Sequence, residues 1–477
     1  MTNTSKLIAL VGLASLAPFA SCNDPLKVSI PDIVQPGQLG DSASLATVKA
    51  GALGDFSIAY TGDHPDGSGG TEGVSMYGGL LADEWINSET FPTRIEVDAR
   101  TIQATNADVD LWFRRMHQSR NSAEKAAAQF AQFAPTDPGH AEMLAIAGLT
   151  YIFFAETWCS GVPVSHLDAS GNINYGAPQT TRQVLDTAIA RFDAALATTT
   201  DGTMTAFATV EKARAVLDTG GFAVAGALAA TVPTSFAYVR EHSENTDRQN
   251  NGVYNGNFPD QRYAVADLEG GNGFRFRSVS DRRTTWRVFV DQAGDTLTGF
   301  DGSTTLWTQQ RYGSRKTSIT VATGVEARLI QAEAALQAGD TLAGGQFLAQ
   351  LNDPRTNAAS RGYFDPSPFD PTDPTTEPIG ALSALSTANI TASGGAVNLL
   401  FAERARWLWL TAHRLGDMRR LVRPKTQGGY ELPVNSVFPT GPYFKVNFAT
   451  YGTDVNFPIP ITEKQNPNFS ACLNRDP

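Results

Sequence analysis

Long segments without proline alternate with segments rich in proline and glycine, and this alternation constrains the fold more than any other feature. Residues 111–133 contain no proline and many Ala, Gln, Arg and Lys, which favour helix. Prolines follow at 135 and 138, and Asp137 between them is placed to cap a second helix over residues 141–158. The short connection predicts that the two helices pack antiparallel.

Further segments are predicted to be helical. One helix is expected over residues 182–198, and another over 209–230 with a break near Gly220-Gly221. Apolar residues at 325, 329, 332 and 336 lie on one helical face, and Gly339-Asp340 would end that helix. The apolar residues at 401, 405, 408, 412 and 415 predict the strongest helix of the chain. Helix–turn–helix units of this size stack in tetratricopeptide arrays, although the repeat is weak in the sequence itself.

Two regions interrupt the helical pattern. Residues 240–320 are rich in Asn, Gly, Asp, Arg and Thr, and they include Gly-Gly-Asn-Gly at 270–273 and Phe-Arg-Phe-Arg at 274–277. We expect an irregular region with short strands there. Residues 362–378 are rich in proline and are expected to form a loop.

The charge balance argues against a nucleic-acid-binding protein. The chain has 37 Lys and Arg against 48 Asp and Glu, so its formal net charge is 37 − 48 = −11. Binding to phosphate backbones needs clustered Lys and Arg. An apolar fraction of 42% is enough for a sizeable core, and no apolar run reaches the 18 residues that a membrane-spanning helix needs.

The first 22 residues indicate export and a lipid anchor. Lys6 supplies a positive charge, and an apolar stretch of 14 residues from Leu7 to Ala20 follows, which is typical of a signal peptide. Two small residues, Ala20 and Ser21, precede Cys22, as in a bacterial lipoprotein cleavage site. We predict cleavage after residue 21, diacylation of Cys22 and a tether over residues 22–45. An ordinary signal peptide with an accidental cysteine, or a short buried helix, are the alternatives.

Two cysteines remain if Cys22 carries lipid. Cys159 and Cys472 then form an even pair in an exported protein, where disulfides persist. We predict that they are bridged, although two buried free thiols would also fit. Two cysteines are too few for a cysteine-rich metal site.

Three segments together resemble the SusD/RagB family of outer-membrane nutrient-binding lipoproteins. These segments are Glu326 to Ala334 with Gly339-Asp340, then Glu403-Arg404 followed by His413-Arg414 and Asp417 to Arg420, and finally Phe457-Pro458-Ile459-Pro460 with Glu463 and Asn466-Pro467-Asn468. The third segment is the most specific. Residues 151–164 also resemble a helix and loop of the family.

The resemblance implies a mainly α fold, in which a tetratricopeptide-like α–α superhelix carries long irregular loops and a few short strands. A single domain would then cover residues 46–477, with the scaffold over about 103–235 and 322–423, a ligand-facing insert over about 240–320 and a C-terminal tail over 424–477. It also implies a surface-exposed, lipid-anchored place in a bacterial outer membrane. The implied partner is a TonB-dependent, SusC-like β-barrel transporter.

The residues that usually carry catalysis show no catalytic pattern. The sequence contains no His-Glu-x-x-His run, nucleophile elbow or phosphate loop. The close carboxylates Asp83-Glu84 and Asp108/Asp110 are interpreted as helix-end and solvated surface charges rather than a glycosidase pair. The charged residues of the second family segment are predicted to form structural ion pairs at i, i+3 or i+4.

A sugar-binding site would need aromatic rings beside polar side chains. We therefore select the aromatic residues that lie in segments too polar to be core, although partial burial under a loop is the alternative for each. The candidate ligand-binding residues are Tyr60, Tyr77, Trp85, Tyr254, Trp286, Trp307 and Tyr312. The tryptophans predicted to belong to the core are Trp112, Trp158, Trp407 and Trp409.

The sequence thus predicts a non-catalytic lipoprotein, without cofactor or metal, that binds an oligosaccharide, with a peptide as the second choice of ligand. It would hand this nutrient to the transporter and contact the membrane through its lipid alone. The alternatives are a secreted carbohydrate-active enzyme and a helical-repeat scaffold that binds other proteins.

Overall fold

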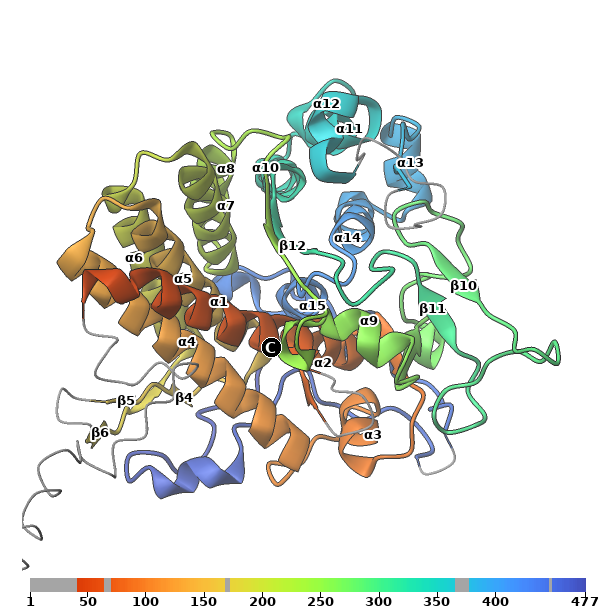
Figure 1. Cartoon of the computed structure of the whole chain (residues 1–477). Helices are drawn as coiled ribbons and strands as arrows, with labels where there is room; N and C mark the ends of the chain where they lie inside the picture. Colours follow the sequence, from red (N-terminus) through yellow and green to blue (C-terminus); the bar gives the residue numbers. More distant parts are fainter. Residues whose placement is uncertain (1–40, 64–69, 168–171, 365–376, 446–447) are drawn as a thin grey trace, which may run out of the picture.

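The computed structural model describes residues 41–63, 70–167, 172–364, 377–445 and 448–477 (Figure 1). The predicted signal peptide, the lipidation site Cys22 and most of the predicted tether lie outside the described residues. Most of the proline-rich segment near residue 370 also lies outside them.

Helices stacked on one another form the scaffold, as predicted. In order of packing, α1 contacts α4, α4 contacts α5, and the series continues through α6, α7 and α8 to α10, which contacts both α11 and α14 (Figure 1). The bounds of these helices are α1 Leu45–Thr61, α4 Ala107–Phe133, α5 Pro138–Thr157, α6 Thr181–Thr198, α7 Gly202–Asp218, α8 Phe222–Ala229, α10 Gly324–Gln337, α11 Gln346–Thr356 and α14 Ala396–Trp407.

Local signals in the sequence set the ends of these helices. The Asp137 carboxylate accepts a hydrogen bond from the backbone N–H of Gly139 (2.7 Å) and so caps α5 as predicted. Asp201 caps α7 in the same way, and α7 therefore begins seven residues before the predicted start at 209. Gly220 (φ 83°) separates α7 from α8, and Gly339 (φ 76°) ends α10, because glycine adopts the left-handed conformation at little cost.

The predicted helix through residues 401–415 is not continuous. Helix α14 ends at Trp407, and α15 (Arg414–Val422) begins after a turn in which Leu410 and Ala412 have φ values of 57° and 63°. The backbone N–H of Leu410 donates to Glu84 Oε1 (2.8 Å), and Tyr60 Oη donates to the carbonyl of Thr411 (3.0 Å). Buried partners distant in sequence thus bond the backbone groups that a continuous helix would pair internally.

The other helices and strands are short. The remaining helices are α2 Val74–Leu81, α3 Pro92–Asp98, α9 Gly252–Asn257, α12 Ala358–Arg361, α13 Thr387–Ala392 and α16 Val434–Val437. The strands form two-stranded antiparallel sheets, which are β1 Gly62–Asp63 with β2 Thr71–Glu72, β3 Trp85–Asn87 with β9 Tyr263–Val265, β4 Val162–Pro163 with β7 Pro178–Gln179, β5 His166–Leu167 with β6 Ile173–Asn174, β8 Ala237–Arg240 with β12 Ile319–Thr323, and β10 Trp286–Val288 with β11 Trp307–Gln309.

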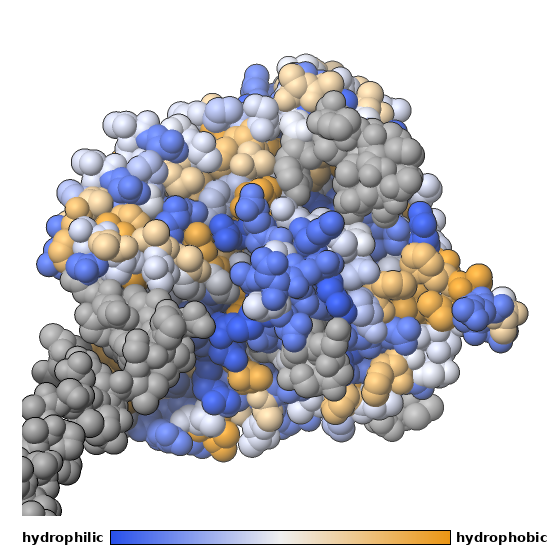
Figure 2. Space-filling model, viewed as in Figure 1, coloured by the Kyte–Doolittle hydropathy of each residue, from blue (hydrophilic) through white to orange (hydrophobic). Residues whose placement is uncertain are grey.

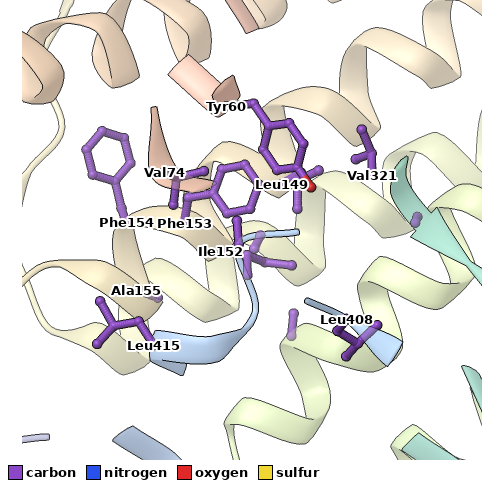
Figure 3. Close-up of a cluster of buried hydrophobic side chains, with 14 of the residues drawn as sticks. Tyr60, Val74, Leu149, Ile152, Phe153, Phe154, Ala155, Val321, Leu408 and Leu415 are labelled. Carbon is purple, nitrogen blue, oxygen red and sulfur yellow. The ribbon is translucent and has the colours of Figure 1, made fainter. Parts of the chain in front are cut away.

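One continuous apolar core runs through the scaffold. In its centre Tyr60 of α1 stacks on Phe153 of α5, with 5.5 Å between the ring centroids (Figure 3). The four tryptophans predicted to be core residues are all buried, which confirms that prediction. None of the described helices is both long and apolar enough to cross a lipid bilayer.

The C-terminal tail is attached to the end of α5. Cys159 and Cys472 form a disulfide, as predicted, across a sequence separation of 313 residues. Backbone hydrogen bonds run beside it, from the N–H of Phe457 to Thr157 (2.9 Å) and from the N–H of Leu473 to Ser160 (2.7 Å). The tail therefore returns to the centre of the scaffold.

The charged residues of the second family segment form a buried ion-pair network, so their predicted structural role is confirmed. Their predicted spacing is mostly wrong, because the partners come from distant elements. Arg414 bonds both carboxylate oxygens of Asp83 (2.7 Å each), and His413 Nε2 lies 3.0 Å from Glu326. Within the segment only Asp417 and Arg420 pair at i, i+3 among the described residues. The network joins α15 to the turn after α2, to α10 and to α14 instead of stabilising one helix surface.

Candidate functional site

A cleft of about 660 Å³ opens where three segments distant in the sequence meet. One wall comes from β3 and the start of α3, another from the irregular region between β9 and β11, and the third from the C-terminal tail. The cleft is lined by Ile86, Glu89, Thr90, Ile95, Glu269, Arg277, Asp301, Ser303, Thr304, Thr305, Trp307, Phe444 and Lys445. Aromatic rings, hydroxyl groups and charges of both signs thus surround one hollow.

Trp307 and Arg277 form the centre of one wall. The guanidinium carbon of Arg277 lies 3.5 Å from the centroid of the Trp307 ring, in a cation–π contact. The carboxylate of Asp267 fixes this turn by accepting hydrogen bonds from the backbone N–H groups of Arg277 (2.9 Å) and Ser278 (3.0 Å). Arg277 Nε is buried and has no hydrogen-bond partner among the described residues.

Lys445 and Asp301 form an ion pair in the lining of the cleft. Lys445 Nζ lies 2.9 Å from Asp301 Oδ2 and donates to Asn87 Oδ1 (2.8 Å). Burial alone would raise the pKa of Asp301, but hydrogen bonds from Thr304 and Ser303 outweigh it and lower this pKa to about 2. Asp301 is therefore an anion whose charge Lys445 balances.

Two buried carboxyl groups are associated with the cleft: Glu269 lines it, and Asp98 bonds Asn87 and Tyr443, which follow and precede the lining residues Ile86 and Phe444. Burial raises the pKa of Glu269, whose Oε2 accepts a hydrogen bond from Tyr451 Oη (2.6 Å). Burial also raises the pKa of Asp98 to about 8, although the backbone N–H of Asn87 (2.8 Å) and Tyr443 Oη (2.9 Å) donate to its carboxyl. These two carboxyl groups therefore retain protons more strongly than carboxyl groups in water.

Exposed aromatic rings lie beside the charged groups. Phe444 lines the cleft and is 42% exposed. Phe91 and Phe300 stack on each other with 6.3 Å between centroids, and the guanidinium of Arg262 lies 5.3 and 5.4 Å from the two rings. Neither ring lines the cleft, although the chain neighbours Thr90 and Asp301 do.

Of the seven predicted ligand-binding residues, Trp307 is placed in the cleft. Trp286 is 36% exposed on β10, the strand paired with β11, but it does not line the cleft. Tyr254 is half-buried on α9 and lies outside the lining as well.

The other four predicted residues belong to the core, so we remove them from the candidate site. Tyr60 is fully buried against Phe153 (Figure 3). Tyr77 lies on α2 and packs against Trp112, with 5.6 Å between the ring centroids. Trp85 and Tyr312 are likewise buried. Polar neighbours in the sequence were misleading, because several of them, such as Asp83, Glu84 and Gln309, are themselves buried.

The sequence analysis missed most of the cleft. Phe300 lies between Gly299 and Asp301-Gly302, and Phe444 follows Gly441-Pro442-Tyr443. Both are aromatic residues in loop-forming sequence, so the rule that selected Trp307 would have found them had it included phenylalanine. No comparable sequence signal marks Arg277 or Lys445.

The carboxylates that were weighed as a possible glycosidase pair have structural roles. Asp83 and Glu84 are buried, which corrects the expectation of solvated surface charge: Asp83 pairs with Arg414, and Glu84 binds the turn before α15. Asp108 and Asp110 lie in the first turn of α4, as predicted for helix-end charges. Across the described residues no group of three or more His, Cys, Asp or Glu side chains is arranged to hold a metal ion.

A second surface feature lies next to the cleft. Trp286 and Val288 lie two apart on β10, Val290 follows just beyond the strand, and all three are exposed, at 36%, 36% and 62%. Because side chains two apart in a strand share a face, Trp286 and Val288 form an apolar strip on β10. An apolar patch is visible over the β10–β11 region in Figure 2.

Comparisons with known proteins identify the fold. No protein-family model matches the sequence, and no curated protein matches it either. Solved structures do match. The chain resembles NanU of B. fragilis over 95% of its own length and 100% of that chain, with a TM-score of 0.59 and 12% identity.

Two further structures give the same result. A laminarin-binding SusD-like protein matches 91% of this chain and 99% of its own, with a TM-score of 0.60 and 13% identity. A SusD superfamily protein of Parabacteroides distasonis matches over the same shares, also with a TM-score of 0.60 and 13% identity. The chain therefore has the SusD-like fold over nearly all of its length, as the sequence motifs predicted.

Proposed function

We propose that this protein is a divergent SusD-like lipoprotein that binds an oligosaccharide in the cleft around Trp307 and passes it to a TonB-dependent outer-membrane transporter. The observation that carries the proposal is the cleft itself, where exposed aromatic rings lie beside hydroxyl and charged groups on a SusD-like scaffold. Sugar rings present flat C–H faces to aromatic rings and hydroxyls to polar side chains. The laminarin-binding neighbour supports a carbohydrate rather than a peptide as ligand.

The proposal needs no covalent chemistry. The ion pairs that line the cleft are already satisfied within the protein, and the carboxyl groups of Glu269 and Asp98 are buried. A bound sugar would be held by stacking and hydrogen bonds, and a lipid on Cys22 would keep the site near the transporter at high effective concentration.

Binding is tested with the full chain purified in detergent and a panel of neutral and acidic glycans and peptides, measured by calorimetry. Phe444→Ala should weaken glycan binding by about tenfold, equivalent to about 1.4 kcal/mol, because a central aromatic contact is lost. Trp307→Ala should do at least as much, but Trp307 also packs against the core.

The matched control is Tyr175→Ala, because Tyr175 is as exposed as Phe444 (43% against 42%) and does not line the cleft. This variant should bind as the unchanged protein does. Equal losses in both variants, or binding that survives Phe444→Ala and Trp307→Ala, would place the site elsewhere. Hydrolysis of a panel glycan would favour the carbohydrate-active enzyme instead.

The transporter and anchor are tested in the native membrane. Mild detergent extraction should recover the protein with a large β-barrel partner, and mass spectrometry should find acyl chains on Cys22 as the first residue. Recovery of the protein alone with an uncut leader would contradict this part of the proposal.

A further inference from the structure

The charges around the cleft differ in whether the protein itself balances them. Asp301 is paired with Lys445 at 2.9 Å, and Glu89 is paired with Arg262 (2.6 Å) and Arg94 (3.2 Å). These pairs leave little net charge for a ligand to meet.

Arg277 is the exception. It lines the cleft, yet no carboxylate lies within ion-pair distance of it in the described part of the chain, and its buried Nε has no acceptor there. Its contact with the Trp307 ring fixes the plane of the guanidinium without using its hydrogen-bond donors. A buried donor without a partner costs free energy that a bound acceptor would recover.

Glu269 also lines the cleft, but it forms no ion pair with Arg277. Burial raises the pKa of Glu269, and Tyr451 already donates to its carboxyl. Burial lowers the pKa of Arg277, and the charges of Asp267 and Glu269 oppose this from beyond ion-pair distance. Asp267 Oδ1 already accepts hydrogen bonds from the amides of Arg277 and Ser278 and from the hydroxyl of Ser278, so neither carboxylate bonds the guanidinium.

From this geometry we infer that the ligand is an acidic glycan, whose carboxylate or sulfate group binds the guanidinium of Arg277 while a sugar ring contacts Phe444. A planar guanidinium matches a carboxylate or sulfate with two parallel hydrogen bonds, and such charged bonds are about twice as strong as neutral ones. Thr90, Ser303 and Thr305 would supply hydroxyl partners for the remainder of the ring. The inference rests on the proposed function and specifies the ligand class of the same cleft.

The experiment compares acidic glycans with neutral forms of the same backbone. Polygalacturonate and its full methyl ester differ in charge but share ring and linkage, and dextran sulfate and dextran form the equivalent sulfate pair. The full chain should bind at least one acidic member about tenfold or more tightly than its neutral form. The two pairs distinguish a carboxylate from a sulfate as the recognised group.

Two substitutions separate Arg277 from a general charge effect. Arg277→Met should remove the preference for the acidic form while leaving the melting temperature nearly unchanged, and Arg277→Lys should restore part of it. Arg275→Met is the matched control, because Arg275 is an exposed arginine two residues away that does not line the cleft. It should bind both forms as the unchanged protein does.

The outcomes separate the inference from the proposed function. Equal or tighter binding of the neutral forms, or a preference that survives Arg277→Met, would overturn the acidic ligand and leave a glycan-binding cleft. An equal loss with Arg275→Met would show non-specific charge attraction and overturn it too. Binding of no glycan, acidic or neutral, would overturn the proposed function itself.

Discussion

Single buried residues set how the protein responds to pH. Asp98 is buried at the end of α3, and its carboxyl accepts hydrogen bonds from Asn87 and from Tyr443, the residue before Phe444. Burial raises its pKa to about 8, and the same effect raises the pKa of Glu84 to about 8. The protein therefore holds protons at these sites that the unfolded chain releases near pH 4.

The folded state binds these protons more tightly than the unfolded state, so the free energy of unfolding should fall as the pH rises from about 4 to 8. Asp98→Asn keeps a carbonyl oxygen for the two hydrogen bonds but cannot ionise. We expect the substitution to make the decline with pH shallower, with part remaining because Glu84 still titrates. Denaturant unfolding at several pH values checks this, and an unchanged slope would show that Asp98 is not protonated at neutral pH.

The sequence only partly predicted which aromatic residues are buried and which are available to a ligand. The four tryptophans predicted to be core residues are buried, although Trp158 and Trp409 lie just beyond the ends of α5 and α14 rather than within a helix. Tyr60 and Trp85 were misplaced, because buried partners come from segments far away in the sequence, such as the carbonyl of Thr320 for Tyr60 and the ring of Tyr263 for Trp85. The polarity of near neighbours does not reveal such partners.

At the scale of elements, the turn between α14 and α15 is the part that sequence periodicity describes wrongly. Helices such as α4, α5 and α6 were predicted closely because their caps and flanking prolines are local signals. The turn arises from tertiary contacts, including the bond from Leu410 to Glu84 across a sequence separation of 326 residues. It aims Arg414 at Asp83, whose Oδ2 also accepts from the N–H of Phe274 beside the cleft.

The left-handed backbone conformation of Ala412 in this turn should lower the free energy of unfolding by a measurable amount. A non-glycine residue in the left-handed conformation costs about 1 kcal/mol or more, and Ala412 has a φ of 63°. Ala412→Gly should therefore leave the free energy of unfolding unchanged or raise it by up to about 1 kcal/mol, after the greater freedom of glycine in the unfolded chain is subtracted.

The same substitution inside α14 provides the control. Ala405→Gly should lower the free energy of unfolding by about 1 kcal/mol, because Ala405 lies in a regular helix. Both variants are compared by denaturant unfolding. If Ala412→Gly were as destabilising as Ala405→Gly, the left-handed turn would be absent in solution.

At the scale of the whole molecule, the cleft depends on segments that only the complete fold brings together. Residues near 90, from 269 to 307 and at 444–445 form its walls, and no local pattern links them. The sequence motifs predicted the scaffold because they lie within it, the first two in its ion-pair network and the third in its core through Phe457. The motifs did not predict the cleft, because the residues that line it lie outside them.

The tail that supplies Phe444 and Lys445 is fixed to the scaffold near its end, and the disulfide between Cys159 and Cys472 is part of that attachment. Replacing both cysteines by serine removes a link across 313 residues, and the loss of such a link typically costs about 2–5 kcal/mol. The backbone bonds of Phe457 and Leu473 to the end of α5 remain, so we expect a folded protein with a melting temperature lower by a few degrees.

The position of the link determines where the loss should appear. Hydrogen exchange should accelerate first at the amides of Phe457 and Leu473, while the amides within α4 and α5 stay protected, because local opening of the tail costs less than global unfolding. Adding reductant should lower the melting temperature of the unchanged protein toward that of the variant and leave the variant unaffected. Uniform acceleration in α4, α5 and the tail would mean that the disulfide stabilises the molecule as one cooperative unit, and an unchanged melting temperature would mean that the backbone bonds alone hold the tail.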